Sequence, residues 1–332
     1  MKVKDIGEVA LIERIAEIVE HADERVIVTI GDDTAVVKPT RLGYSLLTTD
    51  LLVEEVHFTL DTITPWQLGY KSISVNISDI AAMGGLPDYA VISLAVRPDT
   101  NVSLIEDIYR GMADVSRKYD LRIVGGDVTK SEKLIINVAL LGEVEEENLR
   151  RRSDAVIGDV IMVTGELGAS AAGLRIILNP EIEPKVREAG MLKRAHFLPE
   201  PRVEAGRVLT SLGIHAMEDI SDGLASEIKH ICEASSTGAR LFLNKVPMAR
   251  GVSKVAELTG ERAIDIAIAG GEDYELVFTV PAELKAKVEK SMAAIGVKVA
   301  AIGEIVDSSY GIRVVDWSGV EKPLEISGYT HF

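Results

Sequence analysis

Residues 64–85, TPWQLGYKSISVNISDIAAMGG, form the stretch that most clearly decides the fold. Thr64 can cap a helix, Pro65 suits the first helical position, and the Gly84-Gly85 pair ends the helix. Short β-branched segments precede and follow this helix, and a second helical pattern covers residues 103–119. The ranges expected to form strands are 25–30, 44–49, 89–96 and 134–143. This alternation predicts a mixed α/β fold.

One face of the first helix carries both a cation and a carboxylate. Lys71, Val75, Ser78 and Asp79 fall at positions i, i+4, i+7 and i+8, which share a helical face. On this face Asp79 could bind a metal ion while Lys71 contacts phosphate. The alternative is an ordinary face exposed to solvent.

The chain is long enough for two domains. It has 332 residues, and domains usually contain roughly 100–200. The composition becomes charged and irregular at residues 143–158, and the alternation restarts with a strand pattern at 160–164. We therefore expect an N-terminal domain over residues 1–147 and a C-terminal α/β domain over residues 148–332.

Charge and cysteine content exclude several classes of protein. The chain has 36 Lys and Arg against 52 Asp and Glu, a net charge of −16, which argues against nucleic-acid binding. Cys232 is the single cysteine, so an intrachain disulfide and a four-cysteine zinc site are excluded, and its apolar surroundings predict a packed thiol. No apolar run reaches the ~18 residues that cross a membrane. The charged, amphipathic start does not resemble a secretory signal, so we expect a cytoplasmic protein without a membrane partner.

Several aspartates follow strand-like segments and adjoin glycine or small residues. They are Asp32, Asp33, Asp50, Asp79, Asp127, Asp219 and Asp222. Oxygen ligands of this kind suit Mg²⁺, which usually binds one or two carboxylates together with substrate phosphates. Each aspartate alone could equally be a turn or cap residue. The recurrence of the pattern favours phosphate chemistry with several metal ions.

Other polar motifs are weaker individually. The chain contains no P-loop, and residues 165–173 could form either an anion-binding helix start or a tight turn. Gly125-Gly126 would allow close approach of a ligand to the backbone. Residues 270–276, GGEDYEL, place carboxylates after a glycine pair, which is also typical of a hairpin turn. His57 follows a strand near Asp50 and could be structural or contact a substrate.

Together these motifs resemble the thiamine-monophosphate kinase family, within the superfamily typified by aminoimidazole ribonucleotide synthetase. They occur in the family's order over essentially the whole chain. The matching segments are 31–33, 48–50, 57–58, 71–84, 125–127, 219–224, 270–276 and the tail Gly328-Tyr329-Thr330-His331-Phe332.

The resemblance implies a two-domain fold in which the N-terminal domain forms a β-barrel shared with a second copy in a homodimer, with ATP near that interface. The implied Mg²⁺ ligands are Asp33, Thr48, Thr49, Asp50, Asp79, Asp127, Asp219 and Asp222. The implied ATP contacts are Gly126, Asp127, Arg152 and Ser221, although the adjoining Arg150 and Arg151 leave the register of Arg152 open. The implied contacts to thiamine phosphate are His57, Glu272 and Tyr329. Asp50, Asp127 and Asp222 are expected to be the catalytic carboxylates.

The resemblance further implies ATP-dependent phosphorylation of thiamine phosphate to thiamine diphosphate, by in-line transfer assisted by several Mg²⁺ ions. Other members of the superfamily fit less well. Selenophosphate synthetases need an N-terminal cysteine or selenocysteine, hydrogenase-maturation dehydratases need a C-terminal cysteine, and this chain has neither. Aminoimidazole ribonucleotide synthetase remains an alternative by fold.

An alternative from another class is a non-catalytic protein that binds nucleotides or cations as a regulator. Such a protein needs no acceptor site. Substitution of His57, Glu272 or Tyr329 would therefore abolish turnover in an enzyme and leave a pure nucleotide binder unchanged.

Overall fold

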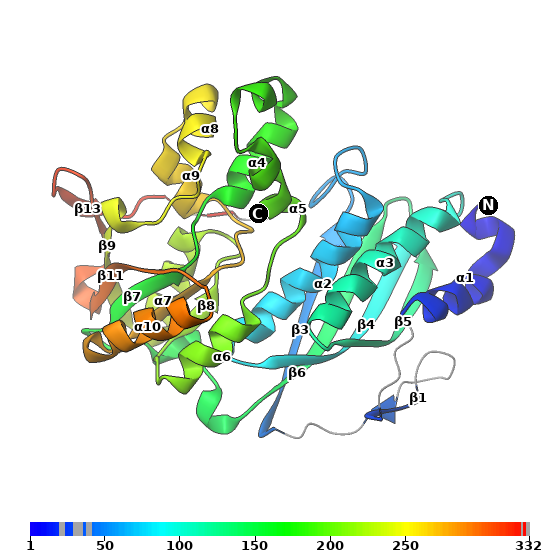
Figure 1. Ribbon diagram of the computed structural model, residues 1–332, viewed down its shortest axis with the longest axis horizontal. Helices are drawn as coiled ribbons and strands as arrows, with labels where there is room; N and C mark the ends of the chain where they lie inside the picture. The colour runs from blue at the N-terminus through cyan, green and yellow to red at the C-terminus, as the bar shows by residue number, and fades with distance from the viewer. Residues whose placement is uncertain (20–23, 29–35, 38–41, 327, 330–332) are drawn as a thin grey trace. The chain divides into compact units, whose positions relative to one another are not determined.

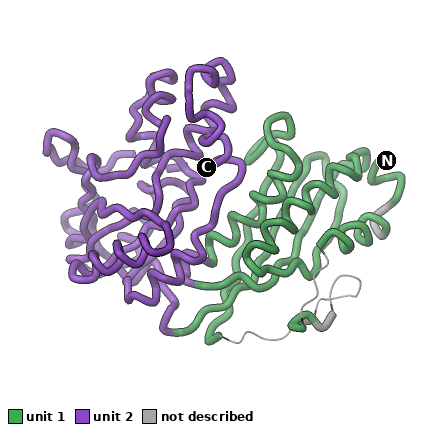
Figure 2. The backbone as a smooth tube through the Cα atoms, in the orientation of Figure 1, with its two compact units in different colours: residues 1–80, 85–146 green, residues 81–84, 147–332 purple. Residues whose placement is uncertain are grey.

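The computed structural model describes residues 1–19, 24–28, 36–37, 42–326 and 328–329. The chain divides into two compact units, coloured separately in Figure 2. Unit 1 contains residues 1–80 and 85–146, and unit 2 contains residues 81–84 and 147–332. The expected domain limits were 1–147 and 148–332; in the structure, residues 81–84 at the end of the 64–85 helix also belong to unit 2.

Unit 1 is built on a four-stranded sheet in the order β3-β6-β4-β5. Its elements are α1 (Val3–Val19), β1 (Val26–Val28), β2 (Val36–Val37), β3 (Tyr44–Val53), α2 (Pro65–Ala82), β4 (Leu86–Val96), α3 (Val102–Lys118), β5 (Arg122–Lys130) and β6 (Ile135–Val144). Strands β4 and β5 are parallel and are connected through α3, whereas β6 is antiparallel to both β3 and β4. The expected helices and strands are present, except that of the strand expected at 25–30 the structure describes only β1, since residues 29–30 lie outside the described residues. Strand β5, which was not predicted, contains the Gly125-Gly126 pair.

Helices α2 and α3 lie against one face of this sheet (Figure 1). The two helices pack closely because Gly69 of α2 faces the backbone of α3: a Cβ atom there would lie 1.8 Å from the carbonyl oxygen of Ile108. Strands β3 and β6 alternate between more and less buried residues, which is typical of a sheet covered on one face.

The opposite face of the sheet exposes apolar side chains. Leu47 and Leu51 of β3 are 79% and 49% exposed, and Val91 of β4 is 40% exposed. Their registers place them on the same face, because side chains alternate along each strand. In the described part of the chain no sheet closes into a barrel, so the expected barrel is not formed by one copy of this chain.

Unit 2 is built on a seven-stranded sheet in the order β13-β12-β9-β11-β7-β10-β8. Its strands are β7 (Val160–Thr164), β8 (Met217–Asp219), β9 (Thr237–Phe242), β10 (Leu276–Val280), β11 (Val299–Asp307), β12 (Ile312–Val315) and β13 (Glu321–Pro323). Its α-helices are α4 (Ala169–Leu178), α5 (Ala189–Phe197), α6 (Val203–Ser211), α7 (Leu224–Ser235), α8 (Val252–Thr259), α9 (Ala263–Ala269) and α10 (Lys285–Ala294). Short 3-10 helices occur at Glu146–Asn148, Arg152–Asp154, Pro180–Lys185, Leu243–Lys245, Ala282–Leu284 and Ser308–Tyr310.

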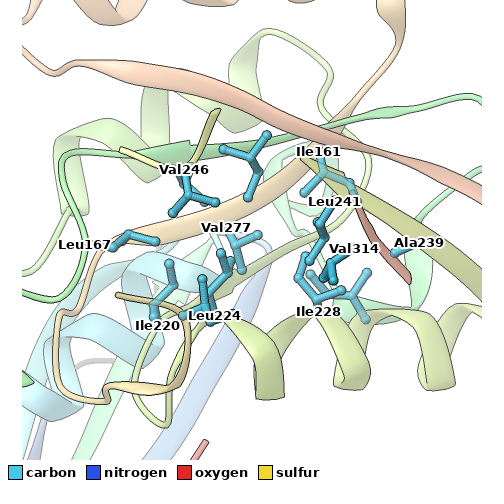
Figure 3. Close-up of a cluster of buried hydrophobic side chains, with 14 of the residues drawn as sticks. Ile161, Leu167, Ile220, Leu224, Ile228, Ala239, Leu241, Val246, Val277 and Val314 are labelled. Carbon is cyan, nitrogen blue, oxygen red and sulfur yellow. The ribbon is translucent and has the colours of Figure 1, made fainter. Parts of the chain in front are cut away.

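Apolar side chains cover both faces of the central strands of this sheet. On one face, Leu224 and Ile228 of α7 join Ile161, Leu241 and Val277 in a buried cluster (Figure 3). A second cluster, formed by the alternate residues of β7 and β10, packs against α6 and α10. Fully buried strands of this kind lose the alternating polar pattern.

Cys232 lies in the cluster that packs α7 against the sheet and is 2% exposed. The prediction of a packed thiol is therefore confirmed, and burial raises the pKa of the thiol to about 11. Of the helices that the structure describes, none combines the length and apolar character needed to span a membrane.

Candidate functional site

In unit 2, two of the predicted motifs lie side by side. The loop after β8, residues 219–223, runs beside residues 270–275, which precede β10. The Ile220 amide donates to the Glu275 carbonyl at 2.7 Å, and the Tyr274 amide donates to the Ile220 carbonyl at 2.9 Å. The Glu272 amide donates to the Ser221 carbonyl at 2.6 Å. These bonds bring the predicted ATP contact Ser221 next to the predicted acceptor contact Glu272.

The C-terminal segment joins the same loop. The Tyr329 amide donates to the Asp222 carbonyl at 3.0 Å, and the Gly328 amide donates to the Ser226 hydroxyl at 3.1 Å. Glycine is required at 328, because a Cβ atom there would lie 2.1 Å from the Asp222 carbonyl oxygen. Tyr329 is 51% exposed. Residues Thr330, His331 and Phe332 of the tail motif lie outside the described residues.

Glu227 of α7 holds this loop through hydrogen bonds, and the sequence did not predict its role. Its Oε1 accepts from the amides of Ser221, at 3.2 Å, and Asp222, at 2.8 Å. The side chain is buried, and burial raises the pKa of the carboxyl to about 8. An acidic residue in the first turn of the helix that follows the 219–223 motif was the available signal.

Two carboxylates, those of Asp273 and Glu275, anchor residues 271–275. Asp273 accepts from the amides of Gly168, at 2.6 Å, and Ser170, at 3.2 Å, at the start of α4. Glu275 accepts from the Thr164 hydroxyl at 2.6 Å and pairs with Arg202. The helix start that we considered as an anion site therefore already binds a carboxylate of the chain itself. The expected succession of strand, turn and helix is confirmed.

The three adjacent arginines differ in their partners. The Arg150 guanidinium donates to the backbone carbonyls of residues 147, 149, 210 and 214, so it has a structural role. Arg151 pairs with Asp154 at 3.1 Å. Arg152 lies 3.0 Å from Glu218 of β8 and keeps a half-exposed side chain. Among the three, Arg152 is the one directed toward the strand that ends in the candidate residue Asp219.

In unit 1, two of the predicted metal ligands come into contact. The Thr48 hydroxyl of β3 donates to the Asp79 carboxylate of α2 at 2.5 Å. Lys71 and Ser78, on the same face of α2, are buried at 2% and 0% exposure. The alternative of a face exposed to solvent is therefore wrong. These neighbouring hydroxyl and carboxylate oxygens are hard donors of the type that Mg²⁺ prefers.

The other candidates of unit 1 are divided between the faces of the sheet. Asp50 pairs with Val138, in the row of Ile92 and Gly126, and shares the helix-covered face with Thr48. Thr49 points to the exposed face, where its hydroxyl donates to Asn137 at 3.1 Å. Asp127 is exposed and pairs with Ser93, one row beyond Asp50, which directs it toward the exposed face as well.

The last two candidates of unit 1 are His57 and Asp33. The Nδ1 atom of His57 accepts from the Val53 amide at 3.0 Å, so this ring stabilises the turn after β3. Asp33 lies outside the described residues. Within the described ranges, no three His, Cys, Asp or Glu side chains form a ready metal-binding group.

Comparison with known proteins places this arrangement in context. Residues 31–144 match the N-terminal domain of AIR synthase related proteins, and residues 156–316 match the C-terminal domain. The chain is 36% identical over 308 residues to the thiamine-monophosphate kinase of Bacillus subtilis, covering 92% of this chain and 93% of that protein.

Two solved structures are also similar. The thiamine-monophosphate kinase of Stenotrophomonas maltophilia has a TM-score of 0.82 and 30% identity, covering 93% of this chain and 96% of that one. The structure of AaThiL complexed with AMPPCP and TMP has a TM-score of 0.77 and 35% identity, covering 100% of this chain and 99% of that one.

Proposed function

The chain belongs to the thiamine-monophosphate kinase family, and we propose that it transfers the γ-phosphoryl group of ATP to thiamine phosphate, giving thiamine diphosphate. One observation of the structure carries this proposal. In unit 2, a backbone hydrogen bond joins Ser221, a candidate nucleotide contact, to Glu272, a candidate acceptor contact. Another connects Asp222, a candidate metal ligand, to Tyr329, the second candidate acceptor contact in this unit. The similar AaThiL structure contains TMP together with AMPPCP, an analogue of ATP.

The chemistry of the acceptor determines what the protein must supply. The attacking atom is a phosphate oxygen, which is already a competent nucleophile and needs no strong general base. The main obstacle is repulsion between two polyanions, so catalysis consists mainly of positioning and charge stabilisation. We therefore propose direct in-line transfer with no covalent intermediate on the protein.

We propose that Mg²⁺ ions neutralise the phosphate charges when bound. The oxygen donors offered are those expected from the sequence: Asp33, Thr48, Thr49, Asp50, Asp79, Asp127, Asp219 and Asp222. The contact between Thr48 and Asp79 supports these two members of the set, because it brings two hard oxygen donors to one point. Asp50, Asp127 and Asp222 are the carboxylates that we propose to be most important for turnover.

The remaining candidates have binding roles in this proposal. Arg152, Gly126 and Ser221 contact ATP, and the half-exposed guanidinium of Arg152 supports its part in this set. Glu272, Tyr329 and His57 contact thiamine phosphate. The thiazolium ring of that substrate carries a permanent positive charge, which a carboxylate complements.

We propose that the chain acts as a homodimer through the exposed face of the unit 1 sheet, where a second copy would complete a shared barrel. Leu47, Leu51 and Val91 make that face apolar. Exposed apolar patches of this kind mark interaction surfaces, and β3 and β5 are edge strands of the described sheet.

The test of the function is a turnover assay with the purified protein, thiamine phosphate, ATP and Mg²⁺. Products are separated by chromatography after oxidation to thiochromes. We expect thiamine diphosphate only when ATP and Mg²⁺ are both present. A folded protein that binds Mg-ATP and forms no product would contradict the proposal that thiamine phosphate is the acceptor, and would leave the superfamily assignment intact.

A further inference from the structure

The backbone around Glu272 adopts a conformation that side chains other than glycine rarely adopt. Glu272 and Tyr274 have φ angles of 64° and 50°, in the left-handed region. Such residues persist only where the surroundings hold them, and they concentrate at binding and catalytic sites. The Glu272 side chain is thus directed by its neighbours rather than by the preference of its own backbone.

One of these neighbours is His196, in the last turn of α5. Its Nδ1 atom lies 3.1 Å from the Glu272 carboxylate and 3.1 Å from the Ser170 hydroxyl of α4. The ring is 7% exposed and makes an edge contact with Phe197, with ring centroids 5.4 Å apart. A proton on Nδ1 can be shared between the two oxygens. Because the ring is buried and packed against Phe197, its orientation is fixed, and its contact with Glu272 in turn orients that carboxylate.

We infer that His196 is a positioning residue of the acceptor site: it holds the Glu272 carboxylate in the orientation that binds the cationic part of thiamine phosphate. The inference rests on the proposed function, since it needs Glu272 to contact the acceptor. Three structural elements meet in this contact, because α4 supplies Ser170, α5 supplies His196 and the strained turn supplies Glu272. No role is assigned to His196 in the phosphoryl transfer itself.

A role in positioning differs measurably from a role in packing alone. His196→Leu introduces an apolar side chain of similar size and removes the nitrogen donor. His196→Asn retains a donor near the place of Nδ1. We expect His196→Leu to raise KM for thiamine phosphate about tenfold, as for loss of a hydrogen bond to a charged group, with KM for ATP unchanged. His196→Asn should restore most of the acceptor affinity.

The double variant with Glu272→Ala isolates the contact, because alanine has no side-chain oxygen to accept from His196. If His196 acts through Glu272, His196→Leu should raise the acceptor KM in the wild-type background and have little further effect in the Glu272→Ala background. His215 provides a matched control in the same unit. Its Nδ1 lies 2.9 Å from the Asp159 carboxylate, so His215→Leu also breaks a histidine–carboxylate contact, and both KM values should stay unchanged.

Each outcome supports or contradicts a specific statement. Equal effects of His196→Leu in both backgrounds, or an equal rise in both KM values, would overturn the inference. An acceptor KM unaffected by Glu272→Ala would remove the substrate role of Glu272 and the inference with it. A wild-type protein that makes no thiamine diphosphate would instead contradict the proposed function. If His196→Leu fails to fold, His196→Met, which also lacks the nitrogen donor, is carried through the same cycle with Glu272→Ala.

Discussion

The two sheets of this molecule differ in how they are covered. The seven-stranded sheet of unit 2 has apolar clusters on both faces, one against α7 and one against α6 and α10. The four-stranded sheet of unit 1 has helices on one face and exposed leucine and valine side chains on the other. A sheet that buries both faces completes its own core, whereas a sheet with an open apolar face has surface left for a partner.

The candidate residues follow the same contrast. In unit 2, the loop at 219–223 is held by backbone bonds and by the buried carboxylate of Glu227. In unit 1, the candidates lie along strands, and Thr48 and Asp79 bind each other. The candidate loop of unit 2 is therefore held mainly by backbone hydrogen bonds, whereas the candidates Thr48, Thr49 and Asp79 of unit 1 make contacts through their side chains.

The largest expected effect tests the candidates of unit 1. Asp50→Asn removes one charge and preserves size, so it should lower turnover by at least about a hundredfold, the scale for losing a charge-stabilising group. Circular dichroism and the melting temperature should stay close to those of the wild type, because Asp50 is not part of the buried core.

Asp99→Asn is the matched control, since Asp99 is an exposed carboxylate of the same unit. It should retain wild-type turnover in the thiochrome assay. A near-wild-type rate for Asp50→Asn would refute the metal role of Asp50.

The second prediction concerns the open face of the unit 1 sheet. Leu51→Asp would place a carboxylate beside the exposed apolar side chains of the proposed interface, at a cost that should raise the dimer dissociation constant at least tenfold, or about 1.4 kcal/mol. Sedimentation velocity should show a shift from dimer to monomer, with unchanged secondary structure.

Leu178→Asp serves as its control, because Leu178 is an exposed leucine of unit 2, at 68%. This change should leave the association state unaltered. A wild-type protein that is monomeric at all concentrations would contradict the proposed dimer, and so would a fully dimeric Leu51→Asp variant.

The sequence predicted the element types well where local signals were strong. The helix expected from Thr64-Pro65 to the glycine pair is present as α2, and the strand at 160–164 is present as β7. Strand β5 was not predicted, because two consecutive glycines weaken the strand pattern. Its conformation is set by pairing with β4, which a single segment does not reveal.

The faces of the sheet could not be predicted for a related reason. The pairing of β4 and β5 shifts register between Ala90 and Val91, where Ile123 and Gly125 are the successive partners. This one-residue irregularity sends Asp127 to the face opposite Asp50, although strand spacing alone would suggest one common cluster. Likewise, the burial of Lys71 depends on packing that helical periodicity does not specify.

The smallest expected effect concerns unit 2, where the Asp273 carboxylate accepts hydrogen bonds from backbone amides of the protein itself. Burial raises the pKa of Asp273 to about 7 from its ordinary 3.8, against the opposite effect of the Gly168 and Ser170 amides. Between about pH 4 and 7, the folded state therefore holds a proton on Asp273 that the unfolded state has lost, and the free energy of unfolding falls as pH rises.

Asp273→Asn cannot titrate and still accepts the α4 amide bonds through its side-chain oxygen, so it should lack this fall. Urea unfolding of both proteins should show the wild type losing stability relative to the variant by at most about 1.4 kcal/mol per pH unit in this window. Asp307→Asn tests the opposite sign, because hydrogen bonds from the Ser309 hydroxyl and amide lower the pKa of the exposed Asp307. The difference in free energy of unfolding between Asp307→Asn and the wild type should change only below about pH 4. A constant difference between the wild type and Asp273→Asn from pH 4 to 7 would show that the Asp273 carboxylate stays charged at the start of α4.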